Sequence, residues 1–221
     1  MDTGKIETGT IIKGKELKGY TLCRVLSENM IMQGYQYQLG VNETANSLSK
    51  RESCRKGFAF LDVQGVLQYL HHGTKLAIIT IPANEDVYVD DEIFRTHRLT
   101  IKKIMHLSDV ATWKYLHKQG VDFTAEHNMA LRYAAYNGYL EALKYLHKQG
   151  VDITVNDNFA VKVATQQGHL EIIKYLHENG DDITVNNNSA IKWASCLGYE
   201  DIVKYLYEHG ADLTKSDSIA V

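Results

Sequence analysis

Three of the ten histidines in this 221-residue chain recur at a fixed interval, which suggests a metal site as the first chemistry to consider. His117, His147 and His177 are 30 positions apart, and Tyr207 takes the next equivalent position. A metal ion needs its nitrogen ligands at about 2 Å. Packed helices lie about 10 Å apart, so equivalent positions on stacked helices cannot share one ion. We therefore expect a partly exposed ladder on the outer helices and no metal.

A second group of imidazoles, His71, His72 and His97, lies in the same half of the chain as the acidic run Asp90–Glu92. Imidazoles beside carboxylates can act as general acids and bases. However, no nucleophile motif, phosphate-binding glycine loop or HExxH helix accompanies them. A calcium site would need more oxygen ligands at regular spacing than the acidic run supplies, so that run is predicted to be a solvated turn. We predict no catalytic residue and no cofactor.

Charge and cysteine usage exclude several kinds of partner. The 24 Lys and Arg residues and 27 Asp and Glu residues give a net charge of −3. The basic residues divide 12 and 12 about residue 100, against 12 and 15 acidic residues, so neither half has the positive excess that nucleic acid binding requires. Cys23, Cys54 and Cys196 have no metal-ligand spacing and are expected to be reduced thiols of an intracellular protein. No window is apolar enough to span a membrane.

The second half of the chain repeats itself, and this repeat must position most of the residues considered above. Gly120, Gly150, Gly180 and Gly210 are 30 apart, and segments 121–150, 151–180 and 181–210 share the same residue at 10 of 30 positions. In the middle copy the shared residues are Asp152, Thr154, Asn158, Ala160, Ala164, Gly168, Lys174, Tyr175, Leu176 and Gly180. Agreement at this level is characteristic of a repeat architecture.

Each copy is predicted to be a helical hairpin. A short helix around Phe159–Ala164 ends at Gly168, and residues 169–177 form a stronger amphipathic helix with Leu170, Ile173 and Leu176 on one side. Gly180 ends that outer helix, and residues 182–188 are polar turn material. A hairpin of this size cannot bury its apolar face alone, so the copies are expected to stack side by side.

The segments GHLEIIKYLHENGDDIT (Gly168–Thr184) and GYLEALKYLHKQGVDIT (Gly138–Thr154) resemble the ankyrin repeat. The resemblance covers about residues 105–221. It departs from the family where TPLH is replaced by Met129–Arg132, Phe159–Lys162 and Ser189–Lys192, and the unit has 30 residues rather than the usual 33. The missing residues fall in the turn, so the projecting hairpin of the family should be short or absent. Units of this kind are similar to the short-repeat ankyrin proteins of large DNA viruses that infect amoebae.

The resemblance implies two domains. Residues 1–104 are predicted to be a small α+β domain, and residues 105–221 an all-α ankyrin-like solenoid of 30-residue helix–turn–helix repeats. The solenoid is expected to contain a half repeat at 105–120, full repeats at 121–150, 151–180 and 181–210, and a truncated repeat at 211–221. Either the last helix frays or the natural protein continues past Val221.

The first domain shows no repeat. Strands are predicted at 20–26, 35–39, 58–61, 76–81 and 99–104, a helix at 62–70 ending near Gly73, and a surface loop at 42–56. The first ~15 residues are expected to be disordered, as chain termini often are. Residues 34–40, 57–61 and 79–101 also look like the region that precedes viral ankyrin arrays, a resemblance that implies architecture and no activity.

Positions that differ between copies are expected to line the concave face of the solenoid and to bind a protein. Tyr133 and Trp193 are the candidate hot spots, because aromatic residues contribute most of the energy at many interfaces. The alternative is that these two rings pack between adjacent units. The full candidate set is Glu126, His127, Tyr133, Tyr136, Asn137, Asn156, Asp157, Val163, Gln166, Gln167, Asn186, Asn187, Trp193, Cys196 and Leu197.

The sequence thus predicts a non-enzymatic module that binds a host or viral protein, located in the host cytoplasm if the chain is viral. Nucleic acid and membranes are not expected as partners. Two alternatives stay open. Residues 1–104 could be an enzyme, for example one with an ADP-ribosyltransferase-like fold, targeted by the repeats. The chain could also be a vestigial paralogue without a partner.

Overall fold

The structure, a computed structural model, describes residues 6–32, 34–44 and 57–213, without the side chains of 155–158 and 185–187. The chain divides into two compact units. The first contains Met1–Leu107 together with Lys114–Asp122, and the second contains Ser108–Trp113 together with Phe123–Val221. Helix α1 (Val110–Lys118) therefore contributes its first residues to the second unit and its last residues to the first.

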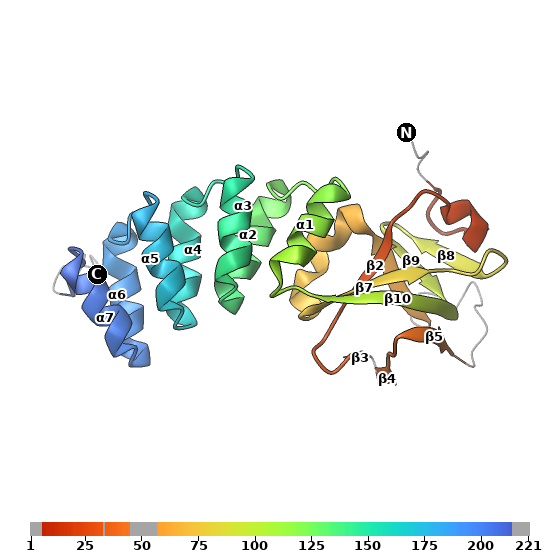
Figure 1. Cartoon of the computed structure of the whole chain (residues 1–221), viewed down its shortest axis with the longest axis horizontal. Coiled ribbons are helices and arrows are strands. Elements are labelled where there is room, and N and C mark those ends of the chain that lie inside the picture. Colours follow the sequence, from red (N-terminus) through yellow and green to blue (C-terminus); the bar gives the residue numbers. More distant parts are fainter. Residues whose placement is uncertain (1–5, 33, 45–56, 214–221) are drawn as a thin grey trace, which may run out of the picture. The chain divides into compact units, whose positions relative to one another are not determined.

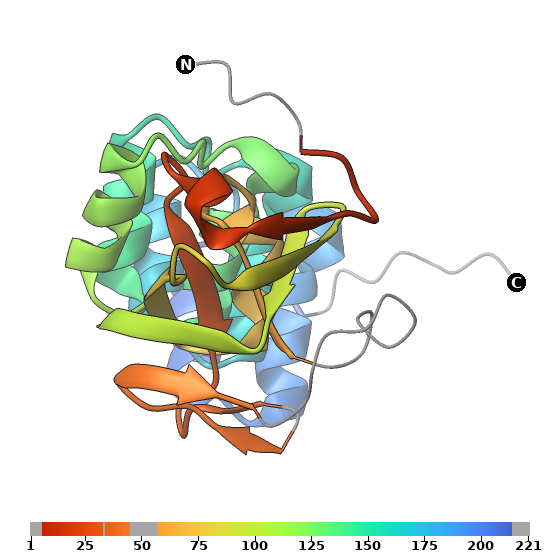
Figure 2. The same ribbon diagram turned by 90° about the vertical axis from the view of Figure 1, so that its right-hand side faces the viewer.

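The first unit is built on an antiparallel eight-stranded sheet in the order β1-β8-β9-β6-β2-β7-β10-β5 (Figures 1 and 2). A separate two-stranded sheet pairs β3 with β4. The strands are β1 (Ile11–Lys13), β2 (Leu22–Leu26), β3 (Ile31–Met32), β4 (Tyr35–Gln36), β5 (Gly40–Glu43), β6 (Phe58–Asp62), β7 (Lys75–Thr80), β8 (Asp86–Asp90), β9 (Ile93–Thr96) and β10 (Arg98–His106).

Alternate residues of these strands form one hydrophobic core, as expected where side chains point to opposite faces in turn. Phe58 and Phe60 of β6 lie in this core, and the Phe60 ring stacks on that of Phe94 with 5.5 Å between centroids. Two 3₁₀ helices complete the unit, η1 (Gly14–Leu17) and η2 (Val63–His72). Helix η2 buries Val66 and Leu70 and ends at Gly73, where the sequence pattern placed the end of a helix.

The first unit contains more strands than the sequence indicated. Strands β1, β3, β8 and β9 were not predicted, and β5 extends into the first residues of the expected 42–56 loop, most of which lies outside the described residues. The prediction of disorder was wrong for 11–15, because Ile11–Lys13 pairs with β8 and Gly14–Leu17 forms η1. Only Tyr35–Gln36 of the predicted 35–39 strand is in a strand. Strands β8 and β9 form a hairpin with each other, whereas β1 and β5 pair only with strands distant in sequence, so the residues of β1 and β5 carry little signal on their own.

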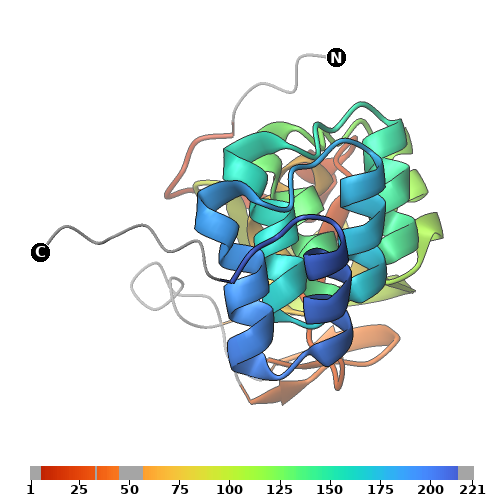
Figure 3. The same cartoon turned by 90° about the vertical axis from the view of Figure 1, so that its left-hand side faces the viewer.

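The second unit consists of helical hairpins (Figure 1). The first helices of the hairpins, here called the inner helices, are α2 (Ala125–Asn137), α4 (Val155–Gln166) and α6 (Val185–Leu197). The second helices, here called the outer helices, are α3 (Leu140–Lys148), α5 (Leu170–Glu178) and α7 (Glu200–Glu208). Each inner helix packs on its own outer helix, and α2 contacts α4, which in turn contacts α6. Figure 3 views these helices along their row, with α6 and α7 nearest to the reader.

The repeated glycine between the two helices of a hairpin does two things. Gly138 and Gly168 have φ of 76° and 77°, the left-handed conformation in which a side chain is strained. Their missing side chain also makes room for the next hairpin. A Cβ on Gly138 would lie 2.7 Å from the His169 ring, and one on Gly168 would lie 3.0 Å from the Tyr199 ring. These glycines therefore fix both the turn and the spacing of the hairpins.

Candidate functional site

Most residues that recur in every hairpin have structural contacts, which separates them from residues free to bind a partner. Asp152 Oδ1 accepts hydrogen bonds from the backbone N–H and the hydroxyl of Thr154, at 2.9 and 2.8 Å. Asp182 and Thr184 repeat this turn at 2.8 and 2.7 Å. These bonds lower the pKa of both aspartates. The recurring Asp and Thr therefore shape the connection between hairpins.

The recurring histidines link neighbouring outer helices. His147 Nδ1 lies 2.8 Å from the hydroxyl of Tyr175, and His177 Nδ1 lies 2.9 Å from that of Tyr205. Both histidines are half-buried. This is the ladder predicted from the 30-residue spacing, with each imidazole bonded to the next hairpin. In the described part of the chain no group of three or more His, Cys, Asp or Glu side chains could hold a metal ion.

The structure places the predicted interface residues on or next to the three inner helices, but their exposure differs. Tyr133 is only 9% exposed and packs between the rings of Trp113 and Tyr139, at centroid distances of 6.3 and 5.9 Å. Val163 is also buried. Tyr133 therefore follows the alternative interpretation for the aromatic rings, packing within the stack, and is wrong as an exposed hot spot, while burial of Val163 contradicts its place on the binding face. Trp193, at the equivalent position of α6, is 43% exposed.

The other candidates fall into three groups. Tyr136, Gln167, Cys196 and Leu197 are exposed, and Asn137 and Gln166 are half-buried. Glu126 and His127 are exposed on a left-handed stretch at the start of α2, with φ of 54° and 53°. The remaining four, whose side chains lie outside the description, are Asn156, Asp157, Asn186 and Asn187.

A basic residue recurs on each inner helix and was missed by the sequence analysis. Arg132, Lys162 and Lys192 occupy equivalent positions, and each lies four residues before Tyr136, Gln166 or Cys196. Residues four apart share one face of a helix. We call these six residues the inner-helix face. The sequence does carry the signal, because a basic residue recurs every 30 positions on the inner helices.

The basic residues of the inner-helix face have no acidic partner within the described part of the chain. None of them is in an ion pair there, whereas Lys144 and Lys174 of the outer helices pair with Glu141 and Glu171 at 2.9 and 2.8 Å. Arg132 instead lies over the ring of Phe159 on the next inner helix, 4.2 Å from its centroid. Within the described residues, the inner-helix face therefore carries positive charge without ion-pair partners, together with the exposed ring of Tyr136.

The hairpins also contain a buried acid. Asp181 is 2% exposed, and neither carboxylate oxygen has a hydrogen-bond partner of good geometry among the described residues. Burial raises the pKa of Asp181 to about 7, with the Asp182 amide opposing and the charges of Asp182 and Asp152 adding to the effect. The equivalent residues of other hairpins are the buried Val121, Val151 and Ala211. Burial of the Asp181 carboxyl group therefore lowers the free energy of unfolding, and the surroundings of Asp181 have no ligand-binding geometry.

The histidines considered for acid–base chemistry are not brought into one site. His72 lies on η2, where it lines a small pocket, and His97 follows β9, where its Nδ1 lies 3.2 Å from the hydroxyl of Thr44. Asp90 and Glu92 flank the β8–β9 turn, and Asp90 is 3.6 Å from the Nε of Arg95. No helix among the described ranges has the length and apolar character of a membrane span.

Comparisons with known proteins identify the helical hairpins. A model of ankyrin repeats in three copies matches residues 131–217, and a model of ankyrin repeats in many copies matches residues 101–147. Two similar proteins belong to Acanthamoeba polyphaga mimivirus. An uncharacterized protein is 29% identical over 53% of this chain and 91% of its own length. A protein named "Putative ankyrin repeat protein" is 30% identical over 47% of this chain and 37% of its own length.

Proposed function

Since residues 101–217 of the chain are ankyrin repeats, we propose that it binds another protein through the inner-helix face and catalyses no reaction. Ankyrin repeats are generally protein-binding modules and typically non-catalytic. The observation that carries the proposal is the recurrence of an exposed or half-buried basic residue, four positions before a second outward side chain, on α2, α4 and α6. Stacked hairpins present such equivalent positions as rows across one surface.

The charge of this face favours an acidic partner segment. Arg132, Lys162 and Lys192 are without carboxylate partners in the described ranges, so an acidic peptide would gain ion pairs without breaking existing ones. Complementary charge accelerates association and selects among partners. Tyr136, which is 53% exposed, supplies an aromatic side chain beside this row. We propose a host protein as the partner, because the similar proteins belong to a virus of amoebae.

Charge reversal tests the face against a matched control. The variant Arg132→Glu/Lys162→Glu/Lys192→Glu changes the inner helices, and Lys118→Glu/Lys148→Glu/Lys204→Glu makes the same change at exposed positions of the outer helices and α1. Full-length chains are immobilised and exposed to Acanthamoeba lysate. The wild type and the outer-helix variant should recover the same protein, and the inner-helix variant should lose it.

Salt and the first unit provide two further checks. Recovery should fall as ionic strength rises, since exposed charge pairs are screened beyond about 10 Å at 0.1 M salt. If both charge-reversal variants recover the protein as well as the wild type does, the inner-helix face is not the binding surface. If residues 1–104 carried an activity, the purified chain would modify lysate proteins in a nucleotide-dependent way, and the non-enzymatic proposal would fail. A chain that recovers nothing would support the vestigial alternative.

A further inference from the structure

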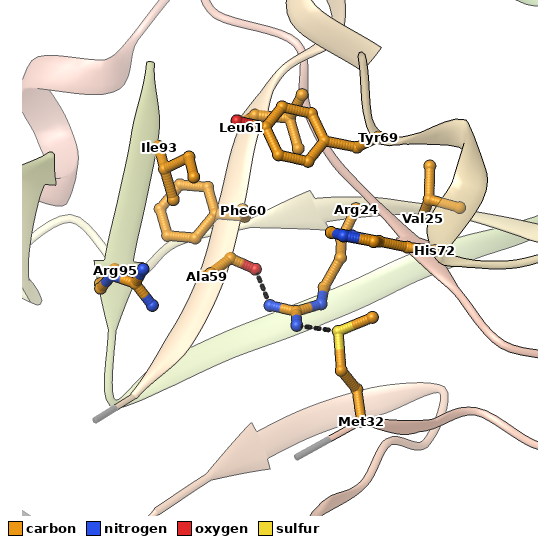
Figure 4. A pocket seen from close by; sticks show the side chains of 10 residues that line it. All are labelled: Arg24, Val25, Met32, Ala59, Phe60, Leu61, Tyr69, His72, Ile93 and Arg95. Carbon is orange, nitrogen blue, oxygen red and sulfur yellow. Dashed lines mark hydrogen bonds between the residues drawn. The ribbon is translucent and has the colours of Figure 1, made fainter. Parts of the chain in front are cut away.

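A small pocket in the first unit is lined by the buried Arg24 and the half-buried Arg95, with no carboxylate among its lining residues. It has a volume of about 130 Å³ and is drawn in Figure 4. A water molecule takes about 30 Å³ in the liquid, so the space corresponds to about four waters. That volume is well below the roughly 300 Å³ at which drug-sized ligand pockets begin. The lining residues are Arg24, Val25, Met32, Ala59, Phe60, Leu61, Tyr69, His72, Ile93 and Arg95.

The pocket exists because two neighbouring strands separate. Strand β2 pairs with β6 only through Leu22 with Asp62 and Cys23 with Leu61, among the residues described. Continuing that ladder would place Arg24 opposite Phe60 and leave no gap. Instead the strands diverge after Cys23, and the Ala59 carbonyl accepts a hydrogen bond from Nη1 of Arg24. The guanidinium group therefore fills part of the gap between the two strands.

Arg24 occupies a core position of its strand. Leu22, Arg24 and Leu26 share one face of β2 by alternation, and both leucines belong to the hydrophobic core. Arg24 itself is only 7% exposed, and its guanidinium lies over the ring of Tyr37 at 5.1 Å. Charged side chains are almost never this buried without a partner of opposite charge, because the loss of water costs several kcal/mol.

The hydrogen bonds of Arg24 do not compensate its charge. Nη2 donates to the Sδ of Met32, which is a weak acceptor, and Nε has no hydrogen-bond partner. Burial lowers the pKa of Arg24, Tyr37 partly opposes this effect, and the charge of Arg95 adds to it. No carboxylate is among these influences. Among the residues that the structure describes, Arg24 therefore lies beside the pocket and a second cation without an acid to balance it.

Arg95 approaches the same pocket from the other side of β6. It pairs with Ala59 across the β6–β9 ladder, and Figure 4 shows the two guanidinium groups on either side of the Ala59 carbonyl. The Nε of Arg95 is buried without a hydrogen-bond partner among the described residues, and it forms an ion pair with Asp90, whose Oδ2 lies 3.6 Å away, too far for a hydrogen bond. Arg95 thus lines the same small volume as Arg24, and the Nε of each arginine is buried without a hydrogen-bond partner among the described residues.

From this arrangement we propose that the pocket binds a small oxyanion, a phosphate or a carboxylate group, held between Arg24 and Arg95. An oxyanion supplies the acceptors that both Nε–H groups lack, and planar guanidinium groups match its geometry. Tyr69 and the solvent-exposed His72 lie at the lining, so the ion can enter from water beside η2. Burial raises the pKa of Tyr69, and the charges of Glu92 and Asp91 add to this effect, but neither carboxylate is among the groups that line the pocket.

Binding should be visible at His72. Burial, His71 and Arg24 all lower the pKa of this imidazole, in that order. An anion between the arginines would favour the protonated ring, because an opposite charge nearby stabilises the charged form. The full-length chain is therefore titrated with sodium phosphate, sodium acetate and sodium chloride at constant ionic strength. The His72 resonances are followed by NMR, and heats of binding are measured by calorimetry.

We expect saturable one-to-one binding of phosphate or acetate, an upward shift of the His72 pKa, and no effect of chloride. The comparison of phosphate with acetate identifies which oxyanion group fits. Arg95→Gln should weaken binding at least tenfold, and Arg24→Met should abolish it. Arg98→Gln removes an exposed arginine that lies 3.9 Å from Glu43 on the same sheet, and it should bind as the wild type does.

Two results would overturn the proposal. One is the absence of saturable binding of either oxyanion to the wild type at millimolar concentration. The other is undiminished binding to Arg95→Gln. If Arg24→Met does not fold, the pair Arg95→Gln and Arg98→Gln still decides the question, because both side chains are on the same sheet and only one lines the pocket.

Discussion

Replacing Asp181 with valine should stabilise the helical hairpins, and the gain should grow with pH. The site is shaped for an aliphatic side chain, since Val121 and Val151 occupy the equivalent positions with 3% and 1% exposure. Burial raises the pKa of Asp181 from 3.8 to about 7. A shift of this size corresponds to about 4 kcal/mol of cost to the ionised folded state, at about 1.4 kcal/mol per pKa unit.

The sign follows from proton linkage. At pH values between the pKa of Asp181 in the unfolded chain and its pKa in the folded chain, the carboxyl group is protonated when folded and ionised when unfolded. The folded chain therefore binds more protons in this pH range. Stability is therefore highest below about pH 4 and is lost progressively as the pH rises to about 7. Between pH 5 and pH 8 the wild type should lose about 2–3 kcal/mol through this residue alone.

Urea denaturation of the full-length chain, followed by helical circular dichroism at pH 5 and pH 8, measures this effect. The difference in free energy of unfolding between Asp181→Val and the wild type should be about 2–3 kcal/mol larger at pH 8 than at pH 5. Asp181→Asn should remove the pH dependence while keeping the shape, and Val151→Asp should create a similar cost in the preceding hairpin. An equal difference at the two pH values would refute the reasoning.

Two further predictions concern contacts between hairpins. Gly168→Ala should lower the free energy of unfolding by about 2 kcal/mol or more, because it strains a left-handed residue and crowds the ring of Tyr199. Gly150→Ala, at φ 89° but with open space around the new Cβ, should lower it by only about 1 kcal/mol. Equal losses for the two variants in urea denaturation would contradict the ring contact. Tyr205→Phe should lower the free energy of unfolding by about 1 kcal/mol, because it removes the hydrogen bond to His177. Tyr207→Phe, at a residue that is 70% exposed, should have no measurable effect on thermal unfolding. Equal effects of the two variants would rule out the histidine–tyrosine ladder as a source of stability.

The hairpins could be predicted because one pattern occurs three times. Each copy independently places its turn glycine, its buried leucine and its Asp–Thr turn, and stacking is the only way such short hairpins can bury their apolar faces. The interface was harder to predict. Variation at Tyr133 and Val163 was taken as a sign of exposure. Both side chains are buried, and Tyr133 packs beside Trp113 at the start of the stack, so variation at a position does not by itself indicate exposure.

The same reasoning explains why the basic residues of the inner-helix face were not predicted. Identity between copies was interpreted as structural, which is correct for Asp152, Thr154 and Gly168. A surface row can also recur, since stacking repeats every outward position along with every inward one. The distinction comes from partners. Lys174 has a carboxylate 2.8 Å away on its own helix, and Lys162 has none among the described residues.

The first unit offers no such internal comparison, and its sheet depends on pairings that sequence alone does not reveal. Alternation does place Arg24 between Leu22 and Leu26 on one face of β2, which indicates that some group must balance a buried cation. What balances the charge of Arg24 depends on how far β2 pairs with β6, because a β2–β6 ladder two residues longer would have closed the gap between these strands. The early divergence of the two strands leaves a carbonyl, a thioether and a cavity in place of a carboxylate. No acid balances Arg24 among the described residues, and this is the role that we propose for a bound oxyanion.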